Sequence, residues 1–268
     1  MNNGLFSIVI PIIPAHYKFV KKLVKSLDKS TYPVHEIIFA ASSQNHWNSR
    51  VLRKEIDLAN SHIRVSIIET NENRTAGQNR NTGWEAAEGD YVCFLDADDT
   101  YAKNRINIIA RIMLDTNSEV LLHDYWRFVP NWALNFRTTY KYKRLICKNE
   151  LKDNTFLGRP RDRNLERGIA GDTNLALPAD IRRLHRIQHG HVTVLRLIEE
   201  RFTNRVVGED GEFARTCLEN GRNVTYVPLR LSNYDRPSFH NITLSIFHRI
   251  ENILSKIKHY LLARFRHC

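Results

Sequence analysis

The 268-residue chain has little cysteine and methionine, and it lacks any long hydrophobic run. Its four cysteines lie far apart and form no C-x-x-C pair, which argues against a disulfide framework or a zinc site. No apolar stretch approaches the length of a membrane-spanning helix. The first residues enter a strand pattern by Phe6 without a signal-like segment. We therefore expect a cytoplasmic protein, with peripheral attachment to a membrane as the alternative.

Glycine is absent from residues 11–21, which begin at the end of the first predicted strand and read PIIPAHYKFVK. A nucleotidyltransferase would carry a glycine-rich phosphate-binding loop with a basic residue there. This absence argues against such an enzyme, which stays an alternative because its chemistry also uses a nucleotide, a metal ion and paired acids.

Basic residues are abundant, since 40 Lys and Arg stand against 29 Asp and Glu and give a net charge of +11. A basic surface favours polyanionic partners such as nucleic acid, an anionic membrane surface or a phosphorylated substrate. The excess is concentrated in residues 137–167, which hold ten Lys and Arg against four acids. A non-enzymatic, basic nucleic-acid-binding protein is thus another alternative, although no zinc-finger or RNA-recognition motif is present.

Short apolar runs alternate with helical patterns, which is typical of a parallel α/β fold. Strands are predicted at residues 6–11, 36–41, 64–69, 91–95, 120–123 and 224–227. Helices are predicted at residues 19–27, 47–60, 78–87, 106–113, 191–201 and 212–219. Residues 125–180 show little periodicity. The fold class predicted is α/β, a mostly parallel sheet with flanking helices.

The C-terminal residues add a helical segment to this domain. Residues 246–262 place seven apolar side chains on one helical face and basic residues on the other. Such a stripe is typical of packing against the domain or against a second copy in a homodimer. An interfacial helix on an anionic membrane is the other interpretation. We expect a main domain over residues 1–240 and a basic amphipathic helix over residues 241–268.

Acidic residues end one of the predicted strands, in the FLDADD segment at residues 94–99. A buried strand ending in Asp96, Asp98 and Asp99 presents them at the carboxyl edge of the sheet, where ligands bind in open α/β folds. Side chains two residues apart share a face, so Asp96 and Asp98 can converge on one cation or sugar. Their oxygen atoms suit Mg²⁺ or Mn²⁺. The alternative is a polar turn in which Asp99 or Thr100 caps the next helix.

Several segments resemble the family 2 glycosyltransferases of the GT-A fold, over about residues 5–240. Residues 76–99 read AGQNRNTG and then AAEGDYVCFLDADD, which is similar to the family's AR-N-x-G and FLDxDD stretches. Residues 207–213 resemble its G-E-D segment, which opens a helix and leads to a final strand. Residues 6–11 are similar to its opening strand, which ends in proline. Motifs in this order are more specific than one motif alone.

The chain departs from the family pattern at two places. AASS at residues 40–43 replaces a segment with an Asp that contacts the nucleotide base, and residues 12–16 lack the usual Tyr-Asn. Both changes fall on the expected base pocket, so a UDP-sugar is only the family's default donor.

The resemblance implies inverting transfer of a sugar from a nucleotide-diphosphate sugar to an acceptor hydroxyl. Residues 1–124 would be the nucleotide-sugar-binding half and residues 125–240 the acceptor-side half. The donor-binding residues implied are Pro11, Arg80, Asp96, Ala97 and Arg236. The ligands implied for Mn²⁺ or Mg²⁺ are Asp98, Asp96 and His240. Asp210 is implied as the general base, and the acceptor-binding residues are Glu209, Gly190 and His191.

Each of these assignments has a structural alternative. Arg80 could form a salt bridge on a helix surface, and Glu209 and Asp210 could simply favour a helix N-terminus. His240 could be an exposed loop residue, and Gly190 with His191 could cap a helix. The acceptor is expected to be a glycan, a glycolipid or another polyanion, including nucleic acid.

Overall fold

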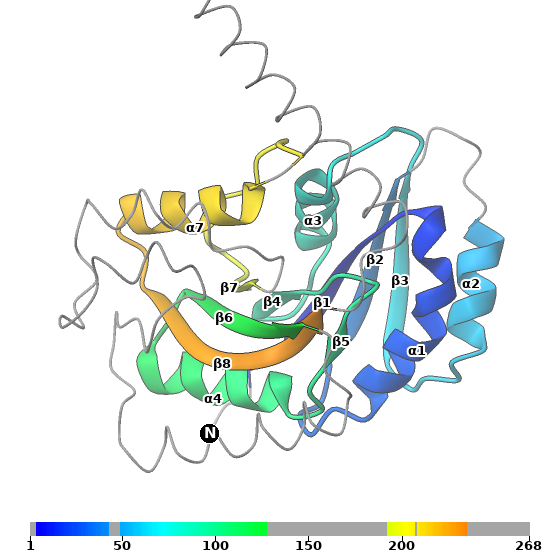
Figure 1. The fold of residues 1–268 in the computed structure, drawn as a ribbon, viewed down its shortest axis with the longest axis horizontal. Helices are drawn as coiled ribbons and strands as arrows, with labels where there is room; N and C mark the ends of the chain where they lie inside the picture. The colour runs from blue at the N-terminus through cyan, green and yellow to red at the C-terminus, as the bar shows by residue number, and fades with distance from the viewer. Residues whose placement is uncertain (1–3, 43–48, 128–191, 207, 235–268) are drawn as a thin grey trace, which may run out of the picture. The chain divides into compact units, whose positions relative to one another are not determined.

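The computed structural model describes residues 4–42, 49–127, 192–206 and 208–234 (Figure 1). Within them, an eight-stranded sheet has the order β3-β2-β1-β4-β7-β6-β8-β5. The strands are β1 (Phe6–Ile12), β2 (Glu36–Ser42), β3 (Arg64–Thr70), β4 (Tyr91–Phe94), β5 (Thr100–Tyr101), β6 (Val120–Arg127), β7 (Val192–Leu195) and β8 (Val224–Tyr234). β1 to β4 pair in parallel, as do β6 and β8, whereas β7 and β5 run antiparallel to their neighbours.

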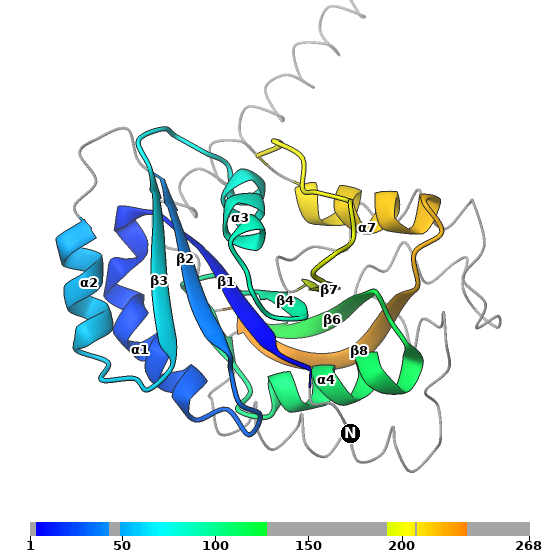
Figure 2. The same cartoon turned by 180° about the vertical axis from the view of Figure 1, so that it is seen from behind.

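Helices cover both faces of this sheet. They are η1 (Pro14–His16), α1 (Tyr17–Asp28), α2 (Ser49–Asp57), α3 (Ala76–Glu85), α4 (Arg105–Thr116) and α7 (Glu209–Glu219). Figures 1 and 2 show α1, α2 and α4 on one face and α3 and α7 on the other. The predicted α/β fold with a mostly parallel sheet and flanking helices is confirmed.

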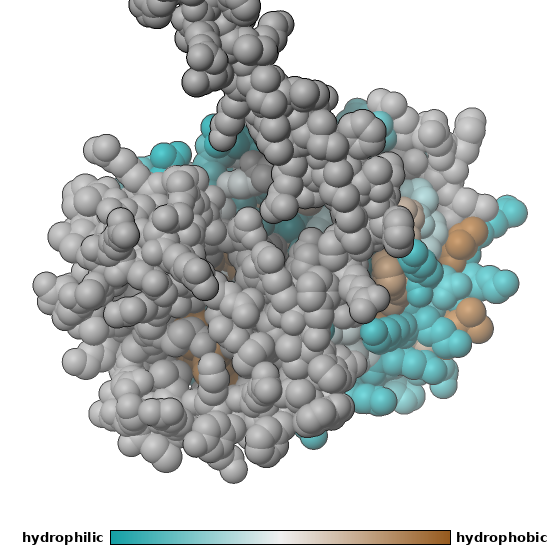
Figure 3. All heavy atoms as spheres, viewed as in Figure 1, coloured by the Kyte–Doolittle hydropathy of each residue, from teal (hydrophilic) through white to brown (hydrophobic). Residues whose placement is uncertain are grey.

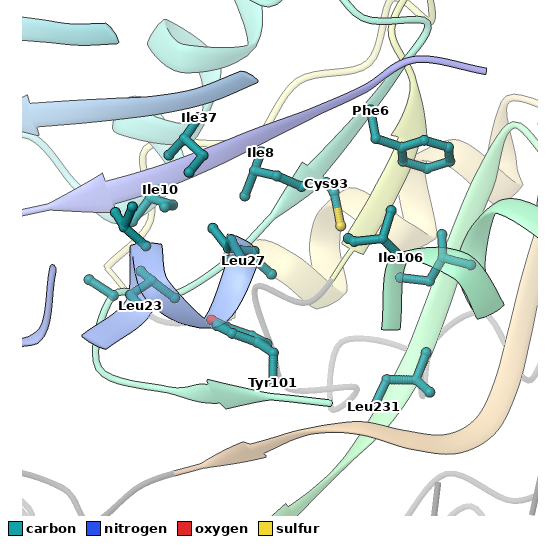
Figure 4. Close-up of a cluster of buried hydrophobic side chains, with 14 of the residues drawn as sticks. Phe6, Ile8, Ile10, Leu23, Leu27, Ile37, Cys93, Tyr101, Ile106 and Leu231 are labelled. Atoms are coloured by element: carbon teal, nitrogen blue, oxygen red, sulfur yellow. The ribbon is translucent and has the colours of Figure 1, made fainter. Parts of the chain in front are cut away.

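Two hydrophobic clusters fix this arrangement, one on each face of the sheet. In Figure 4, Ile8 and Ile10 of β1 lie beside Leu23 and Leu27 of α1, in a cluster that continues to α4 and β8. On the opposite face, Trp84 of α3 belongs to a cluster with side chains from β4, β7 and α7. Alternate residues of a strand point to opposite faces, so β1 supplies both clusters.

The helix predicted at residues 191–201 is wrong. Residues 192–195 form β7, which pairs antiparallel with both β4 and β6, and a turn follows. The segment Val-Thr-Val-Leu is rich in β-branched residues, which favour strands. Its apolar residues fit a helical spacing as well. The segment forms a strand because its backbone pairs with β4 on one side and β6 on the other.

Other predictions are confirmed with shifted boundaries or lie outside the described residues. β6 continues to Arg127, beyond the predicted end at residue 123. The basic cluster at residues 137–167 and the amphipathic segment at 246–262 lie outside the described residues, so the domain division stays a prediction. Among the helices that the structure does describe, none is long and apolar enough to cross a membrane.

Candidate active site at the carboxyl edge of the sheet

The acidic segment follows β4 at the edge where the parallel strands end. The amide of Asp99 donates to the carbonyl oxygen of Asp96 at 3.3 Å, which closes a tight turn. Asp96 and Asp98 are partly exposed and Asp99 is buried. Thr100 lies in β5, and α4 begins only at Arg105, so capping of that helix by Asp99 or Thr100 is wrong. The turn therefore leaves Asp96 and Asp98 at the surface of the site.

Arg80 brings this turn together with the G-E-D segment. Its guanidinium donates to Asp96 Oδ1 at 3.0 Å, and to Glu209 Oε1 and Asp210 Oδ1, both at 2.9 Å. It also lies over the ring of Phe202, 5.3 Å from the centroid. Only 3% of its side chain is exposed, so the alternative of a surface salt bridge is wrong.

Electrostatics keep Arg80 charged in this position. Burial by itself lowers the pKa of Arg80, but the carboxylates of Asp210, Asp96 and Glu209 outweigh it, and the net pKa is raised. A buried cation surrounded by three carboxylates is paired rather than isolated, which is the condition for tolerating charge in a protein interior. The guanidinium can therefore orient all three acids at once.

The G-E-D segment reaches Arg80 because α7 begins there. Gly208 has a positive φ of 87°, a conformation that glycine adopts readily, and Glu209 is the first residue of the helix. The acids in the first turn suit the positive end of the helix dipole, so this alternative is compatible with their contact to Arg80. Phe213 then stacks on Phe202 with 4.5 Å between centroids, which holds α7 against the segment that follows β7.

Gly77 permits the close approach of α3 to the segment before α7. A Cβ at this position would lie 2.5 Å from the carbonyl oxygen of Thr203 and 3.1 Å from Cβ of Phe202. The first contact is with backbone, so relief requires a shift of one element.

Gly77→Ala is therefore expected to lower the free energy of unfolding by about 1–3 kcal/mol, the usual cost of overpacking. Alanine favours a helix over glycine by about 1 kcal/mol, so stabilisation in urea unfolding would contradict the close approach. Glu85→Ala, on the exposed end of α3, is the control and should change stability by less than about 0.5 kcal/mol.

Tyr101 and Arg105, which the sequence did not single out, stabilise the turn formed by residues 96–99. The hydroxyl of Tyr101 donates to the carbonyl oxygen of Asp96 at 2.6 Å. Burial, and then the nearby Asp99 and Asp96, raise the pKa of Tyr101 well above its ordinary value, so the hydroxyl keeps its proton. Arg105 is 1% exposed, lies over the Tyr101 ring and donates to Nε2 of His123 at 3.1 Å. The one signal in the sequence for this support is that Arg105 begins a helix rich in apolar residues.

The predicted base pocket shows what replaces the family's Asp. Ala40 and Ala41 are buried in β2, with Pro11 of β1 opposite Ala40. Ser42 ends the strand and accepts a hydrogen bond from Nδ2 of Asn79 at 2.8 Å. A buried hydroxyl–amide pair therefore ends β2, where the family pattern has a carboxylate.

A pocket of about 640 Å³ lies between α1 and residues 97–103. Ala97, Asp98 and Asp99 line one side of it, and lysines of α1 line the other. Among the described residues, no group of three His, Cys, Asp or Glu is arranged to hold a metal ion. Mg²⁺ ordinarily takes one or two carboxylates and completes its shell with substrate phosphates and water. The oxygen donors of Asp98 and neighbouring Asp96 fit that requirement.

The structure thus brings Arg80, Asp96, Glu209 and Asp210 into direct contact, and places Ala97 and Asp98 beside them on the same turn. Gly190, His191, Arg236 and His240 lie outside the described residues, and their predicted roles stay predictions.

Comparison with known proteins identifies the family and the fold of the chain. Residues 7–170 match the model of the family described as "Glycosyl transferase family 2". An uncharacterized glycosyltransferase of Haemophilus influenzae is 29% identical over 166 residues, which are 59% of this chain and 63% of the relative. A UDP-Glc:alpha-D-GlcNAc-diphosphoundecaprenol beta-1,3-glucosyltransferase of Escherichia coli, WfgD, is 24% identical over the same shares. The match spans less than two thirds of each relative's length.

Solved structures share the fold at low sequence identity. Residues 1–349 of Staphylococcus aureus TarS in complex with UDP-GlcNAc superpose with a TM-score of 0.59 and 15% identity, covering 87% of this chain and 59% of that TarS fragment. A mannosyltransferase of Pyrobaculum calidifontis in complex with GDP-Man and Mn²⁺ gives a TM-score of 0.57 and 14% identity, covering 89% and 59%. The family match covers more than half of the chain, and we conclude that the chain belongs to glycosyl transferase family 2.

Proposed function

We propose that the protein is a metal-dependent, inverting glycosyltransferase that moves a sugar from a nucleotide-diphosphate sugar to an acceptor hydroxyl. The observation that carries the proposal is the contact of Arg80 with both Asp96 and Asp210. It joins a strand-end acid on the donor side to a helix N-terminal acid that can serve as a base. The nucleotide sugars named for WfgD and for the TarS and mannosyltransferase complexes support this class of donor.

Asp210 is the proposed general base. Its carboxylate takes the proton of the acceptor hydroxyl while the hydroxyl oxygen forms a bond to the anomeric carbon. The bond from that carbon to the diphosphate breaks on the opposite side, and its electron pair leaves with the nucleoside diphosphate. Arg80 holds Asp210 and Glu209 in place through this single displacement, and Glu209 orients the acceptor.

Asp98, with Asp96 beside it, would hold Mn²⁺ or Mg²⁺. When bound, such an ion supplies Lewis-acid stabilisation of the diphosphate leaving group. The chain's own contribution is the fixed turn, because the Tyr101 hydroxyl and the Asp99 amide both bind the Asp96 carbonyl oxygen.

The first test is a screen of UDP-, GDP- and other nucleotide sugars for metal-dependent hydrolysis, which identifies the donor without an acceptor. Once the donor is identified, its turnover by the Asp98→Asn variant should be at least about a hundredfold lower than by the parent. Loss of a metal ligand removes several kcal/mol of charge stabilisation from the transition state. Binding of Mn²⁺ with the nucleotide diphosphate, followed by calorimetry, should weaken in parallel.

Asp115→Asn is the matched control, because Asp115 is exposed on α4 and outside the site. Full turnover by Asp98→Asn in excess chelator would contradict the metal role.

A further inference from the structure

One face of α1 carries a row of lysines that the proposed reaction does not use. Its buried face includes Tyr17, Val20 and Leu23, and the exposed face carries Lys18, Lys21, Lys22 and Lys25, with Lys29 one turn further. Residues three and four apart are neighbours on a helix surface. At a rise of 1.5 Å per residue, the row extends over roughly 17 Å. Figure 3 shows hydrophilic residues gathered over α1 and α2.

This row forms one wall of the pocket beside Asp98. The opposite wall is residues 97–101 with Lys103, whose carbonyl oxygen accepts from the amide of Thr31 at 2.9 Å and so ties the two walls together. Six lysines line the pocket against three carboxylates, Glu55, Asp98 and Asp99. A concave site with this surplus of positive charge attracts an anion.

Three lysines of this row have no internal partner for their charge among the described residues. Within the part of the chain that the structure describes, Lys21, Lys25 and Lys29 make no ion pair or hydrogen bond through their ammonium groups. Arg222, by contrast, pairs with both Glu119 and Glu200. The ammonium groups of Lys21, Lys25 and Lys29 are therefore available to an external anion.

We propose that this lysine pocket binds the phosphate groups of a phosphodiester-linked glycan acceptor, an inference that rests on the proposed transferase function. The ammonium of lysine is a point charge that binds phosphate in many orientations, which suits a repetitive chain. A row of roughly 17 Å is longer than one diphosphate requires, so it points to several phosphates in succession. The row begins at the carboxyl edge of the sheet and shares its pocket with Asp98, so a chain bound along it has hydroxyls near the site of transfer. The concave shape favours a chain over a flat bilayer.

The test measures binding of a fluorescent six-unit oligo(glycerol phosphate) by anisotropy, with neutral oligoglycerol of equal length as the uncharged probe. The variant Lys21→Gln/Lys25→Gln/Lys29→Gln removes three positive charges from the pocket. The control Arg50→Gln/Arg53→Gln/Lys54→Gln removes three positive charges from the neighbouring α2. None of these three residues lines the pocket. Both sets are exposed, so thermal melting should show both variants folded.

The parent should bind the anionic probe and not the neutral one. The pocket variant should lose roughly tenfold in affinity. The slope of its log K against log salt should become shallower by about 2.1–2.7, because each of the three lost phosphate contacts contributes about 0.7–0.9. The α2 control should stay within about twofold of the parent. If the triple variant melts early, Lys25→Gln alone should flatten the slope by about 0.7.

Three results would overturn the proposal. Equal weakening in the α2 control would show a general charge effect. Displacement of the probe by UDP would assign the pocket to the donor. If the pocket variant still bound the probe but no longer sedimented with phosphatidylserine vesicles, the pocket would be assigned to a membrane surface. Donor hydrolysis by the parent is measured separately, so its absence would contradict the proposed function while the probe measurement still stands.

Discussion

Asp210→Asn is expected to slow sugar transfer by about two to four orders of magnitude, the usual contribution of a general base. The amide keeps the shape of the side chain, and its oxygen can still accept the hydrogen bond from Nη1 of Arg80. The variant loses the ability to take the proton of the acceptor hydroxyl, and Arg80 keeps the carboxylates of Asp96 and Glu209 as charged partners. Steady-state kinetics with the identified donor should therefore show a lower kcat and a nearly unchanged KM for the donor.

The control for this experiment is Glu212→Gln on the same helix. Glu212 binds Thr203 and Arg205 instead of Arg80, so its loss should leave kcat within about threefold, as expected away from the reacting atoms. A variant Asp210→Asn with normal kcat and weakened donor binding would show that Asp210 is a binding residue, and the proposed mechanism would then be wrong.

Arg80→Met is expected to lower the free energy of unfolding by about 3–5 kcal/mol, because it leaves carboxylates without their buried partner. Three acids, Asp96, Glu209 and Asp210, bind this one guanidinium. Methionine replaces the hydrophobic stem but not the charge. Urea unfolding measures the loss, and transfer activity should fall with it because the base and the acidic turn are no longer held together.

The pH dependence separates charge from packing in this variant. The raised pKa of Arg80 keeps the parent's guanidinium charged across the range from pH 7 to about 4. In Arg80→Met the three carboxylates repel one another, and protonation relieves the repulsion. The difference in unfolding free energy between variant and parent should therefore narrow as the pH falls from 7 toward about 4, where carboxyl groups ordinarily protonate.

Arg74→Met is the matched control for Arg80→Met. Arg74 pairs with Glu72 at the surface, where an ion pair contributes about 1 kcal/mol or less. A loss of that size for Arg80→Met as well, or a difference that does not change with pH, would show that Arg80 is not the centre of a buried charge cluster.

The sequence by itself determined the family, the α/β class and the edge of the sheet at which the acids lie. Strands β1 to β4 alternate with helices, and each is specified by a local apolar pattern bounded by turn residues. The acids that follow β4 were found for the same reason, because an apolar run that ends in carboxylates is visible within a few residues. Such features depend only on neighbours in the chain.

Tertiary structure decided the contacts between segments far apart in sequence. Arg80 meets Asp210 across 130 positions, and no local pattern predicts that its guanidinium is buried against three acids. Residues 192–195 form a strand because they pair with both β4 and β6, although the apolar spacing of this segment also fits a helix. In the sequence, the lysines of α1 are typical of a solvated helix face. In the folded protein, residues 97–103 lie beside them and the two segments line one pocket. In each case the deciding partner lies elsewhere in the chain, and only folding brings it within contact distance.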